Sequence, residues 1–218
     1  MTREQVWQAV GVGIEKVRRL KEQGYGIVAT GEMGIGNTTT SSAAAAVLLG
    51  LPAEQMTGRG AGLSAEGLER KVAVIKAAIK KHRPDPKNPL DVLAKVGGLD
   101  IAGLAGVFLG GALYRIPVVV DGFISSVAAL CAARMVPLAK EYMICSHVSK
   151  EPAGKCLLDA LGLPTHGQGI APQTLMAPMR LDKKSLGGAL RIILLKEIGA
   201  CYVETTSVDW FAPVGDYL

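Results

Sequence analysis

The sequence predicts an α/β protein with a mostly parallel sheet and helices on both faces. Short apolar runs that suit buried strands alternate with longer helix-like runs, as in sheets whose strands are joined by crossover helices. Hydrophobic residues make up 49% of the 218 residues, aromatic residues 5%, and glycine occurs 27 times. This composition is typical of a globular protein in which small residues let helices pack closely on a sheet. The length suits one domain, or slightly more, with an ample core.

Charge and cysteine content narrow the class of protein. The formal net charge of +5 favours anionic small molecules. Because no basic stretch is interleaved with aromatic residues, we expect no nucleic-acid partner. The first residues are unlike a signal peptide, and charge-free runs such as 101–114 are too short and glycine-rich to cross a bilayer. We therefore expect a cytoplasmic protein that is not membrane-bound. Its cysteines lack C-x-x-C and zinc-ligand spacing and are expected to be reduced: Cys131, Cys145, Cys156 and Cys201.

The first 50 residues predict a helix, a strand, a turn and a second helix. Thr2 can cap a helix that runs from about Arg3 to Gln23. Its apolar residues recur at helical spacing and should face the core: Val6, Val10, Ile14, Val17 and Leu20. Gly24 ends this helix, residues 26–30 suit a short buried strand, and residues 41–49 suit a helix.

The segment 31–40, between that strand and the second helix, is the main candidate for ligand binding. Its sequence, GEMGIGNTTT, has three glycines within six residues, which lets the backbone approach a ligand closely. A strand, a glycine turn and a helix direct unpaired amides and a positive helix end at an anion, so we expect an open main-chain cup near Gly34. Asn37 and the threonines can cap the helix or donate to phosphate oxygens.

This segment differs from two better-known phosphate-binding patterns. A Walker A loop ends in Gly-Lys-Ser/Thr, and no lysine lies between Thr30 and Gly50. A dinucleotide-binding loop needs a third glycine where Thr39 stands here. A tight strand-to-helix turn without any ligand is the alternative reading of the same residues.

The later elements continue the alternation of helices and strands. A second glycine cluster, 57–62, precedes a helix that Ser64 caps and that ends near Lys80. The basic residues at its end suit a solvated helix terminus. Further helices are expected over 88–96, 99–114 and 123–135, and strands over 116–121 and 142–145. Beyond these, residues 166–178 suit a loop, 184–198 a helix and 202–206 a strand.

Polar residues follow two of the predicted strands. Asp121 ends the apolar run 116–120, and the segment 146–152, SHVSKEP, follows the strand near residue 145. Ligands of open parallel sheets bind at the carboxyl ends of the strands. Asp121 can therefore be a ligand-side carboxylate or a turn residue at the strand end, and the sequence favours neither.

Taken in order, these motifs resemble one family, the nicotinate-nucleotide:dimethylbenzimidazole phosphoribosyltransferases of cobalamin assembly. The resemblance covers about residues 1–164, and its most specific parts are the segments GEMGIGNTT, VDGFIS and SHVSKEP. The cluster 58–64, Arg70-Lys71 and the segment 97–103 also match. We accordingly divide the chain into a phosphoribosyltransferase core, residues 1–164, and a divergent C-terminal segment, residues 165–218.

The resemblance implies a Rossmann-like fold, here in an incomplete version, and a transfer reaction. In that reaction the phosphoribosyl group of nicotinate mononucleotide moves to a ring nitrogen of 5,6-dimethylbenzimidazole, which gives α-ribazole 5′-phosphate and nicotinate. Such chemistry depends on positioning and electrostatics, because the leaving ring carries a positive charge and departs well. The scheme requires no cofactor and no metal. The family also implies a homodimer.

Several residues match the family's ligand-binding positions. Four of them match its phosphate and ribose cradle: Glu32, Gly34, Gly36 and Asn37. Lys71 matches a phosphate contact, and three residues match ligand-side positions less firmly: Gly60, Asp100 and Ser149. Three of these also have ordinary structural readings, with Lys71 as an exposed helix lysine, Asp100 as a helix N-cap and Ser149 as a turn residue.

The chain departs from the family pattern in two places. It begins without the N-terminal portion that contributes to the benzimidazole pocket in the family. Where the family has its general-base glutamate, the alignment after Met179-Arg180-Leu181 places Lys183, and Asp182 is the weak substitute. A protonated lysine cannot accept the proton that the attacking ring must lose. Two alternatives therefore stand beside the transferase: a non-catalytic nucleotide-phosphate-binding remnant that needs a partner chain, and a phosphoribosyltransferase for a different acceptor.

Overall fold

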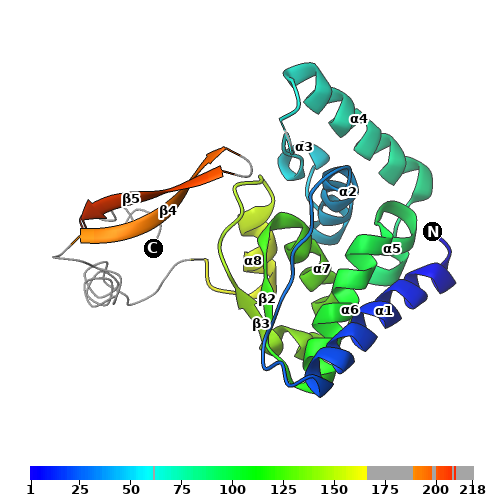
Figure 1. Cartoon of the computed structure of the whole chain (residues 1–218). Coiled ribbons are helices and arrows are strands. Elements are labelled where there is room, and N and C mark those ends of the chain that lie inside the picture. Colours follow the sequence, from blue (N-terminus) through cyan, green and yellow to red (C-terminus); the bar gives the residue numbers. More distant parts are fainter. Residues whose placement is uncertain (61, 166–188, 198–199, 208, 210–218) are drawn as a thin grey trace. The chain divides into compact units, whose positions relative to one another are not determined.

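The computed structural model describes residues 1–60, 62–165, 189–197, 200–207 and 209. The chain divides into two compact units, Met1–Thr165 and His166–Leu218. Helices and a parallel sheet form the first unit, and the second contains an antiparallel pair of strands (Figure 1).

The first unit is built on a three-stranded parallel sheet with the order β1-β2-β3. These strands are β1 (Val28–Ala29), β2 (Val118–Val120) and β3 (Met143–Cys145). Val28 pairs with Val118, and Val119 pairs with Ile144. The α/β class and the parallel sheet predicted from the sequence are confirmed.

Helices make up most of the first unit. The first four helices along the chain are α1 (Arg3–Glu22), α2 (Thr38–Leu49), α3 (Ala53–Met56) and α4 (Ala65–His82). The later ones are α5 (Pro89–Val96), α6 (Leu99–Tyr114), α7 (Gly122–Met135), the 3₁₀ helix η1 (Pro137–Tyr142) and α8 (Gly154–Leu161). The helices α6 and α7, which precede and follow β2 in the chain, both pack against it.

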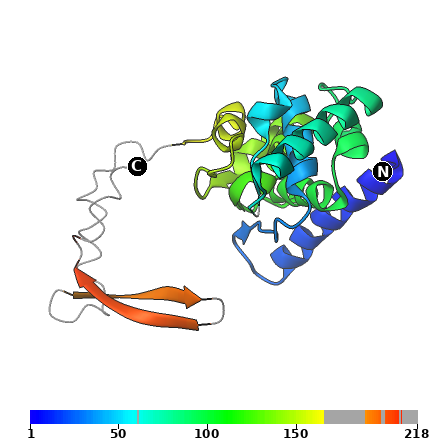
Figure 2. The same ribbon diagram turned by 90° about the horizontal axis from the view of Figure 1, so that it is seen from above.

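The long helix α1 lies beside α6 on the outside of the unit (Figure 1, Figure 2). Its residues Val6, Val10 and Val17 are fully buried, as their helical spacing predicted. The two helices approach so closely that a Cβ at Gly106 would lie 2.0 Å from the carbonyl oxygen of Val10. A Cβ at Gly13 would lie 2.0 Å from a backbone oxygen of α6. Glycine at these positions is therefore what lets α1 cover the core.

Side-chain caps define the starts of three helices. Thr2 and Gln5 form a reciprocal capping box at α1, and the Ser64 hydroxyl accepts a hydrogen bond from the amide of Gly67 at α4. Asn88 caps α5 in the same way. Each cap satisfies an amide that has no partner within its helix, typically worth about 1 kcal/mol. The caps predicted at Thr2 and Ser64 are confirmed.

Two predicted elements of the first unit differ from the structure. The strand expected over 26–30 as a buried element is the two-residue β1, which lies at the edge of the sheet with Ala29 exposed. Because β2 pairs with it on one side only, β1 is not covered as a central strand would be. The helix expected to begin at residue 41 begins at Thr38, so the threonines belong to its first turn.

The second unit contains an antiparallel pair, β4 (Ala189–Glu197) and β5 (Ala200–Ser207). The helix predicted over 184–198 is therefore wrong for residues 189–197. The run from Ile192 to Leu195 is continuously apolar and has no helical period. Such a short run is compatible with either a helix or a strand. Pairing with the neighbouring run, in which Ile193 is opposite Val203, decides for a strand. The strand predicted over 202–206 is confirmed, and residues 166–178 lie outside the described part of the chain.

Two features are absent from the described residues. No helix there is both long and apolar enough to cross a membrane. No group of three or more His, Cys, Asp or Glu side chains in that part of the chain is arranged to hold a metal ion.

Candidate functional site

The carboxyl ends of the three parallel strands lead into the loops that form the candidate site. A pocket of about 300 Å³ lies there. Five residues expected from the sequence to contact a ligand line it together with a sixth that was not expected: Glu32, Gly34, Gly60, Asp121, Ser149 and Glu151. Segments that are more than 100 residues apart in the chain therefore meet at one place, as the parallel-sheet rule predicted.

Lys71 is the best-defined charged group near this pocket. It extends from α4, is 7% exposed, and donates hydrogen bonds from Nζ to Thr38 Oγ1 at 2.9 Å and to the Gly58 carbonyl at 3.0 Å. The alternative reading of Lys71 as an exposed helix lysine is therefore wrong. Burial lowers the pKa of Lys71, and the nearby Glu151 carboxylate partly offsets that shift. Lys71 is thus a fixed, desolvated cation.

The first turn of α2 lies directly beside this lysine. Thr38, which accepts from Lys71, is the first residue of the helix, and the amides of a first turn have no acceptor within the helix. Gly60 leaves room at the same point, because a Cβ there would lie 3.0 Å from Thr38 Oγ1 and 3.7 Å from Lys71 Nζ. A helix N-terminus, a hydroxyl and an ammonium that converge on an open space form an anion-binding arrangement.

The turn at Gly34 differs from the open cup that the sequence predicted. The Gly34 amide donates to the carboxylate of Glu32, and Asn37 Nδ2 donates to the same oxygen at 2.7 Å. Gly34 has φ +76°, which turns the chain so that Glu32 reaches an amide two residues further on. The expectation of a free amide at Gly34 is therefore wrong for this structure, and the anion-binding arrangement lies at Thr38 instead. Gly36, with φ +83°, shapes the same turn.

Asn37 and Asp100 connect this turn to α6. Asn37 occupies the N-cap position of α2, but its side chain donates to Glu32 and, at 2.7 Å, to Asp100 Oδ2. Gly98, not Asp100, is the N-cap residue of α6, so the N-cap reading of Asp100 is wrong. Asp100 instead fixes Asn37, which in turn holds Glu32 at the pocket.

Asp121 begins a second group of polar residues at the ends of β2 and β3. Its Oδ1 lies 3.8 Å from His147 Nδ1, and that nitrogen is 2.8 Å from Ser146 Oγ. Ser146 Oγ in turn donates to the Val120 carbonyl at 2.8 Å. Asp121 and His147 are each about half exposed. The sequence motif SHVSKEP contained His147, but its pairing with Asp121 depends on the alignment of two strands and could not be inferred from the motif.

Ser149 and Glu151 complete the loop after β3. The Ser149 hydroxyl accepts from the Glu151 amide at 3.3 Å, which agrees with a turn residue that also lines the pocket. One carboxylate oxygen of Glu151 is fully buried and has no hydrogen-bond partner among the described residues. A Cβ at Gly58 would lie 1.8 Å from that oxygen, so Gly58 makes room for it. Sequence analysis did not single out Glu151 as a site residue.

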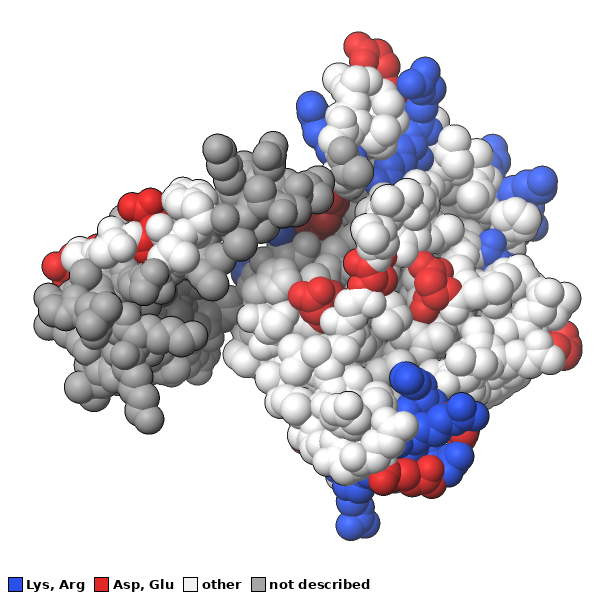
Figure 3. All heavy atoms as spheres, viewed as in Figure 1, with Lys and Arg blue, Asp and Glu red and all other residues white. Residues whose placement is uncertain are grey.

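The pocket is therefore polarised. Thr38, the first residue of α2, lines it and is hydrogen-bonded to Lys71, and the carboxylates of Glu32, Asp121 and Glu151 also line it. Acidic side chains also gather near the middle of the face of the first unit in Figure 3, whereas Lys and Arg lie mainly over α4 and α1. Such a pocket suits a ligand with an anionic group at one end and a centre that becomes positively charged at the other.

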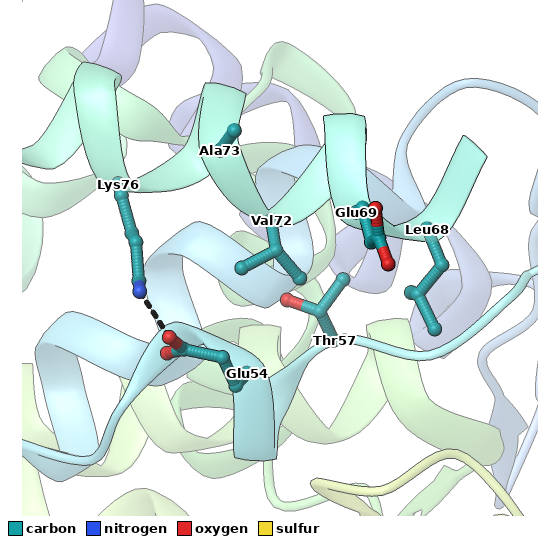
Figure 4. A pocket seen from close by; sticks show the side chains of 7 residues that line it. All are labelled: Glu54, Thr57, Leu68, Glu69, Val72, Ala73 and Lys76. Atoms are coloured by element: carbon teal, nitrogen blue, oxygen red, sulfur yellow. Dashed lines mark hydrogen bonds and ion pairs between the residues drawn. The ribbon is translucent and has the colours of Figure 1, made fainter. Parts of the chain in front are cut away.

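A second hollow, of about 400 Å³, lies between α3 and α4 (Figure 4). Its wall is formed mainly by apolar side chains such as Leu68 and Val72, and the Glu54–Lys76 ion pair lies at one end. The Thr57 hydroxyl there already donates to the Ala53 carbonyl. This hollow has no converging anion-binding groups comparable with those at Lys71, so we place the candidate site at the strand ends.

Asp182, the weak candidate for a catalytic base, lies outside the described residues, as does Lys183. The structure consequently says nothing about either side chain.

Comparison with known proteins gives matches of three kinds. Residues 1–196 match the family described as Phosphoribosyltransferase, which extends past residue 164, where the motif resemblance ends. The chain is 54% identical over 162 residues to a nicotinate-nucleotide–dimethylbenzimidazole phosphoribosyltransferase of Acetivibrio thermocellus, over 74% of this chain and 46% of that protein. It is 48% identical over 204 residues to the protein of that name in Ruminiclostridium cellulolyticum, over 94% and 55% of the two chains.

Among solved structures, the crystal structure of CobT from Thermus thermophilus superposes with a TM-score of 0.72 at 41% identity, over 76% of this chain and 49% of that one. The chain thus spans about half the length of the curated relatives it matches. The sheet, the helices and the family match agree with a Rossmann-like α/β fold. The chain belongs to the phosphoribosyltransferase family whose curated members are named nicotinate-nucleotide–dimethylbenzimidazole phosphoribosyltransferase.

Proposed function

We propose that this chain transfers the phosphoribosyl group of nicotinate mononucleotide to 5,6-dimethylbenzimidazole, with α-ribazole 5′-phosphate and nicotinate as products. The observation that carries the proposal is the pocket itself, which is lined by Thr38, the hydrogen-bond partner of buried Lys71, and by the carboxylates of Glu32, Asp121 and Glu151. The named relatives support the choice of substrates. Within this proposal, one group of site residues binds the phosphate and another acts on the sugar.

The phosphate of the mononucleotide would bind at Lys71, with the Thr38 hydroxyl and the first-turn amides of α2 as further donors. A phosphate accepts hydrogen bonds from groups of all these kinds. Binding energy from this remote group can orient the sugar carbon that reacts. Lys71 is pre-positioned by Thr38 and Gly58, so little side-chain entropy is lost when the phosphate arrives.

The carboxylates would act on the sugar. As the bond to nicotinate lengthens, positive charge develops on the ribose ring, and a fixed carboxylate stabilises that charge more than it stabilises the ground state. Asp121 and Glu32 line the pocket and suit this role. Glu32 is held by Gly34 and Asn37, so its charge is already oriented before the substrate binds.

The function is tested by incubating the full chain with nicotinate mononucleotide and 5,6-dimethylbenzimidazole and measuring both products. Release of nicotinate that depends on the acceptor, with matching formation of α-ribazole 5′-phosphate, is the expected result. The proposal would be contradicted if the mononucleotide binds tightly but no nicotinate is released, whichever acceptor is present. The Lys71→Met variant, which should lose binding, controls for a contaminating enzyme.

A second candidate function uses the same anion-binding arrangement. It is a non-catalytic nucleotide-phosphate-binding role that needs a partner chain, with the phosphate at Lys71 and Thr38. Turnover that appears only after the part of a relative that this chain does not span is added would favour it. Turnover with a purine or a phenol in place of the benzimidazole would favour a different acceptor.

We also propose that the chain forms a homodimer in the cytoplasm. A hollow of about 630 Å³ is lined by α6 and by the segment after α7, and its exposed apolar side chains include Leu113, Val136 and Leu138. Exposed apolar patches of this kind mark interaction surfaces. Sedimentation of the purified chain tests this, and a monomer at micromolar concentration would contradict the dimer.

A further inference from the structure

The loop after β3 contains a histidine for which the reaction has a use. We propose that His147 accepts the ring proton that the benzimidazole loses when it attacks the sugar. This inference rests on the proposed function and adds a residue to it. The resemblance implies a base glutamate at the position where Lys183 stands in this chain, and a lysine does not supply that base.

The hydrogen bonds of His147 decide which ring nitrogen is free. Ser146 Oγ lies 2.8 Å from the Val120 carbonyl oxygen and 2.8 Å from His147 Nδ1. A carbonyl oxygen can only accept, so the single hydroxyl proton of Ser146 must point to Val120. Nδ1 must then carry the proton that it shares with the Ser146 oxygen. It follows that Nε2 of the neutral ring is unprotonated and can act as a base.

The imidazole is held in place by the end of the sheet. Both the amide and the hydroxyl of Ser146 donate to the carbonyl of Val120, the last residue of β2. Val120 itself is paired with Cys145, the last residue of β3. A base whose second nitrogen is fixed by a hydrogen bond keeps both its tautomer and its orientation, as in other catalytic histidines.

Asp121 supplies the negative charge that such a base requires. Its Oδ1 lies 3.8 Å from His147 Nδ1, too far for a hydrogen bond but close enough to stabilise the imidazolium that forms on proton uptake. Asp121 also lines the pocket, and His147 is the neighbour of that carboxylate. The arrangement is not a serine nucleophile with its base, because the Ser146 proton is donated to Val120.

The other carboxylates near the pocket are less suited to this proton transfer. Glu32 already accepts two hydrogen bonds, from Gly34 and from Asn37. One oxygen of Glu151 is fully buried, and the residue lies near the ammonium of Lys71. The side chain of His147 is 52% exposed, and its Nε2 lies on the opposite side of the ring from Nδ1, the nitrogen that contacts Ser146.

The step balances without any further reactant. The unprotonated benzimidazole nitrogen forms a bond to the anomeric carbon, while the carbon–nitrogen bond to nicotinate breaks and its electron pair stays on the pyridine nitrogen. The other ring nitrogen gives its proton to His147 Nε2, and the electrons of that N–H bond return to the benzimidazole ring. The imidazolium then releases the proton to water.

A pair of acceptors separates this role from a structural one. 5,6-Dimethylbenzimidazole has a ring proton to lose, whereas 1,5,6-trimethylbenzimidazole has the same nucleophilic nitrogen and none to lose. The variant His147→Asn can keep a donor to Ser146 but cannot take up a proton. We expect it to lower kcat with the dimethyl acceptor about 100-fold, in the usual range for general-base catalysis. With the trimethyl acceptor we expect kcat to change less than threefold.

His82→Asn is the matched control, because His82 lies in the last turn of α4 and is exposed. It should change neither rate. Equal losses with both acceptors in His147→Asn, or no loss with either, would overturn the role of His147. If the unaltered chain transfers to neither acceptor, the proposed function itself fails. The measurement on the wild-type chain alone therefore distinguishes this outcome from a failure of the role of His147.

Discussion

Compared with the edge of the pocket at Asp121 and His147, the end at Lys71 is closed and fixed. Lys71 is 7% exposed and makes two hydrogen bonds to groups of other segments. Asp121 and His147 are each about half exposed and lie 3.8 Å apart. The difference suggests a division of work, in which one end binds a constant group tightly and the other remains open for the reacting rings.

The sharpest way to break this contrast is to remove the cation. Lys71→Met keeps most of the side chain's length but removes the charge, so the phosphate loses a charge-assisted hydrogen bond. We expect nicotinate mononucleotide to bind more weakly by about 1.5–3 kcal/mol, roughly a 10- to 150-fold increase in Kd. Isothermal titration measures it. Lys76→Met is the control, since Lys76 pairs with Glu54 away from the pocket.

The pH dependence of binding tests the same lysine without a large change in shape. Burial lowers the pKa of Lys71, so its charged form is lost at a lower pH than for an exposed lysine, whose pKa is about 10.4. Since the charged form binds phosphate, Kd should rise as the pH increases toward the ordinary lysine range. We expect Lys71→Met to abolish this rise. A rise of the same size in the variant would mean that another group titrates.

A smaller effect is expected from the glycine that makes room beside Lys71. Gly60 has φ +54°, and its added Cβ would lie 3.0 Å from Thr38 Oγ1. Gly60→Ala combines a left-handed backbone, which costs roughly 1–2 kcal/mol, with a contact at the phosphate position.

Gly62→Ala is the control for Gly60→Ala. Gly62 also has a positive φ, but among the described residues no heavy atom lies within 4 Å of its added Cβ. Both variants should lower the melting temperature, and Gly60→Ala alone should raise Kd severalfold. Equal Kd values in the two would contradict a phosphate site beside Gly60.

Features set by local sequence patterns could be predicted, whereas features set by distant segments could not. Periodic apolar residues such as Val6, Val10 and Val17 predicted the buried face of α1, and Thr2 and Ser64 predicted helix starts, because these signals are local. The approach of Asp121 to His147 depends on the register of β2 and β3, which no local pattern encodes.

Burial was equally difficult to predict where it depends on distant segments. Lys71 looked like a surface lysine because its helix is amphipathic, and it is buried because the loop at Gly58 covers it. Glu32 was expected at the ligand site and lines the pocket, but its bond to the Gly34 amide depends on the backbone conformation of that glycine. For β4, an apolar run without a clear period was resolved by pairing with the next strand.

The effect expected at the open edge of the pocket is on kcat and not on binding, because Asp121→Asn removes a charge and keeps the shape. If Asp121 stabilises positive charge on the sugar and on His147, kcat should fall about tenfold while Kd for the mononucleotide changes little, because neither charge exists in the ground state. Asp159→Asn, at a carboxylate that pairs with Lys155 on α8, should leave both quantities unchanged. An Asp121→Asn variant that weakens binding but keeps kcat would assign the carboxylate to the bound substrate. The two ends of the pocket would then share one role, and the contrast between them would be one of exposure alone.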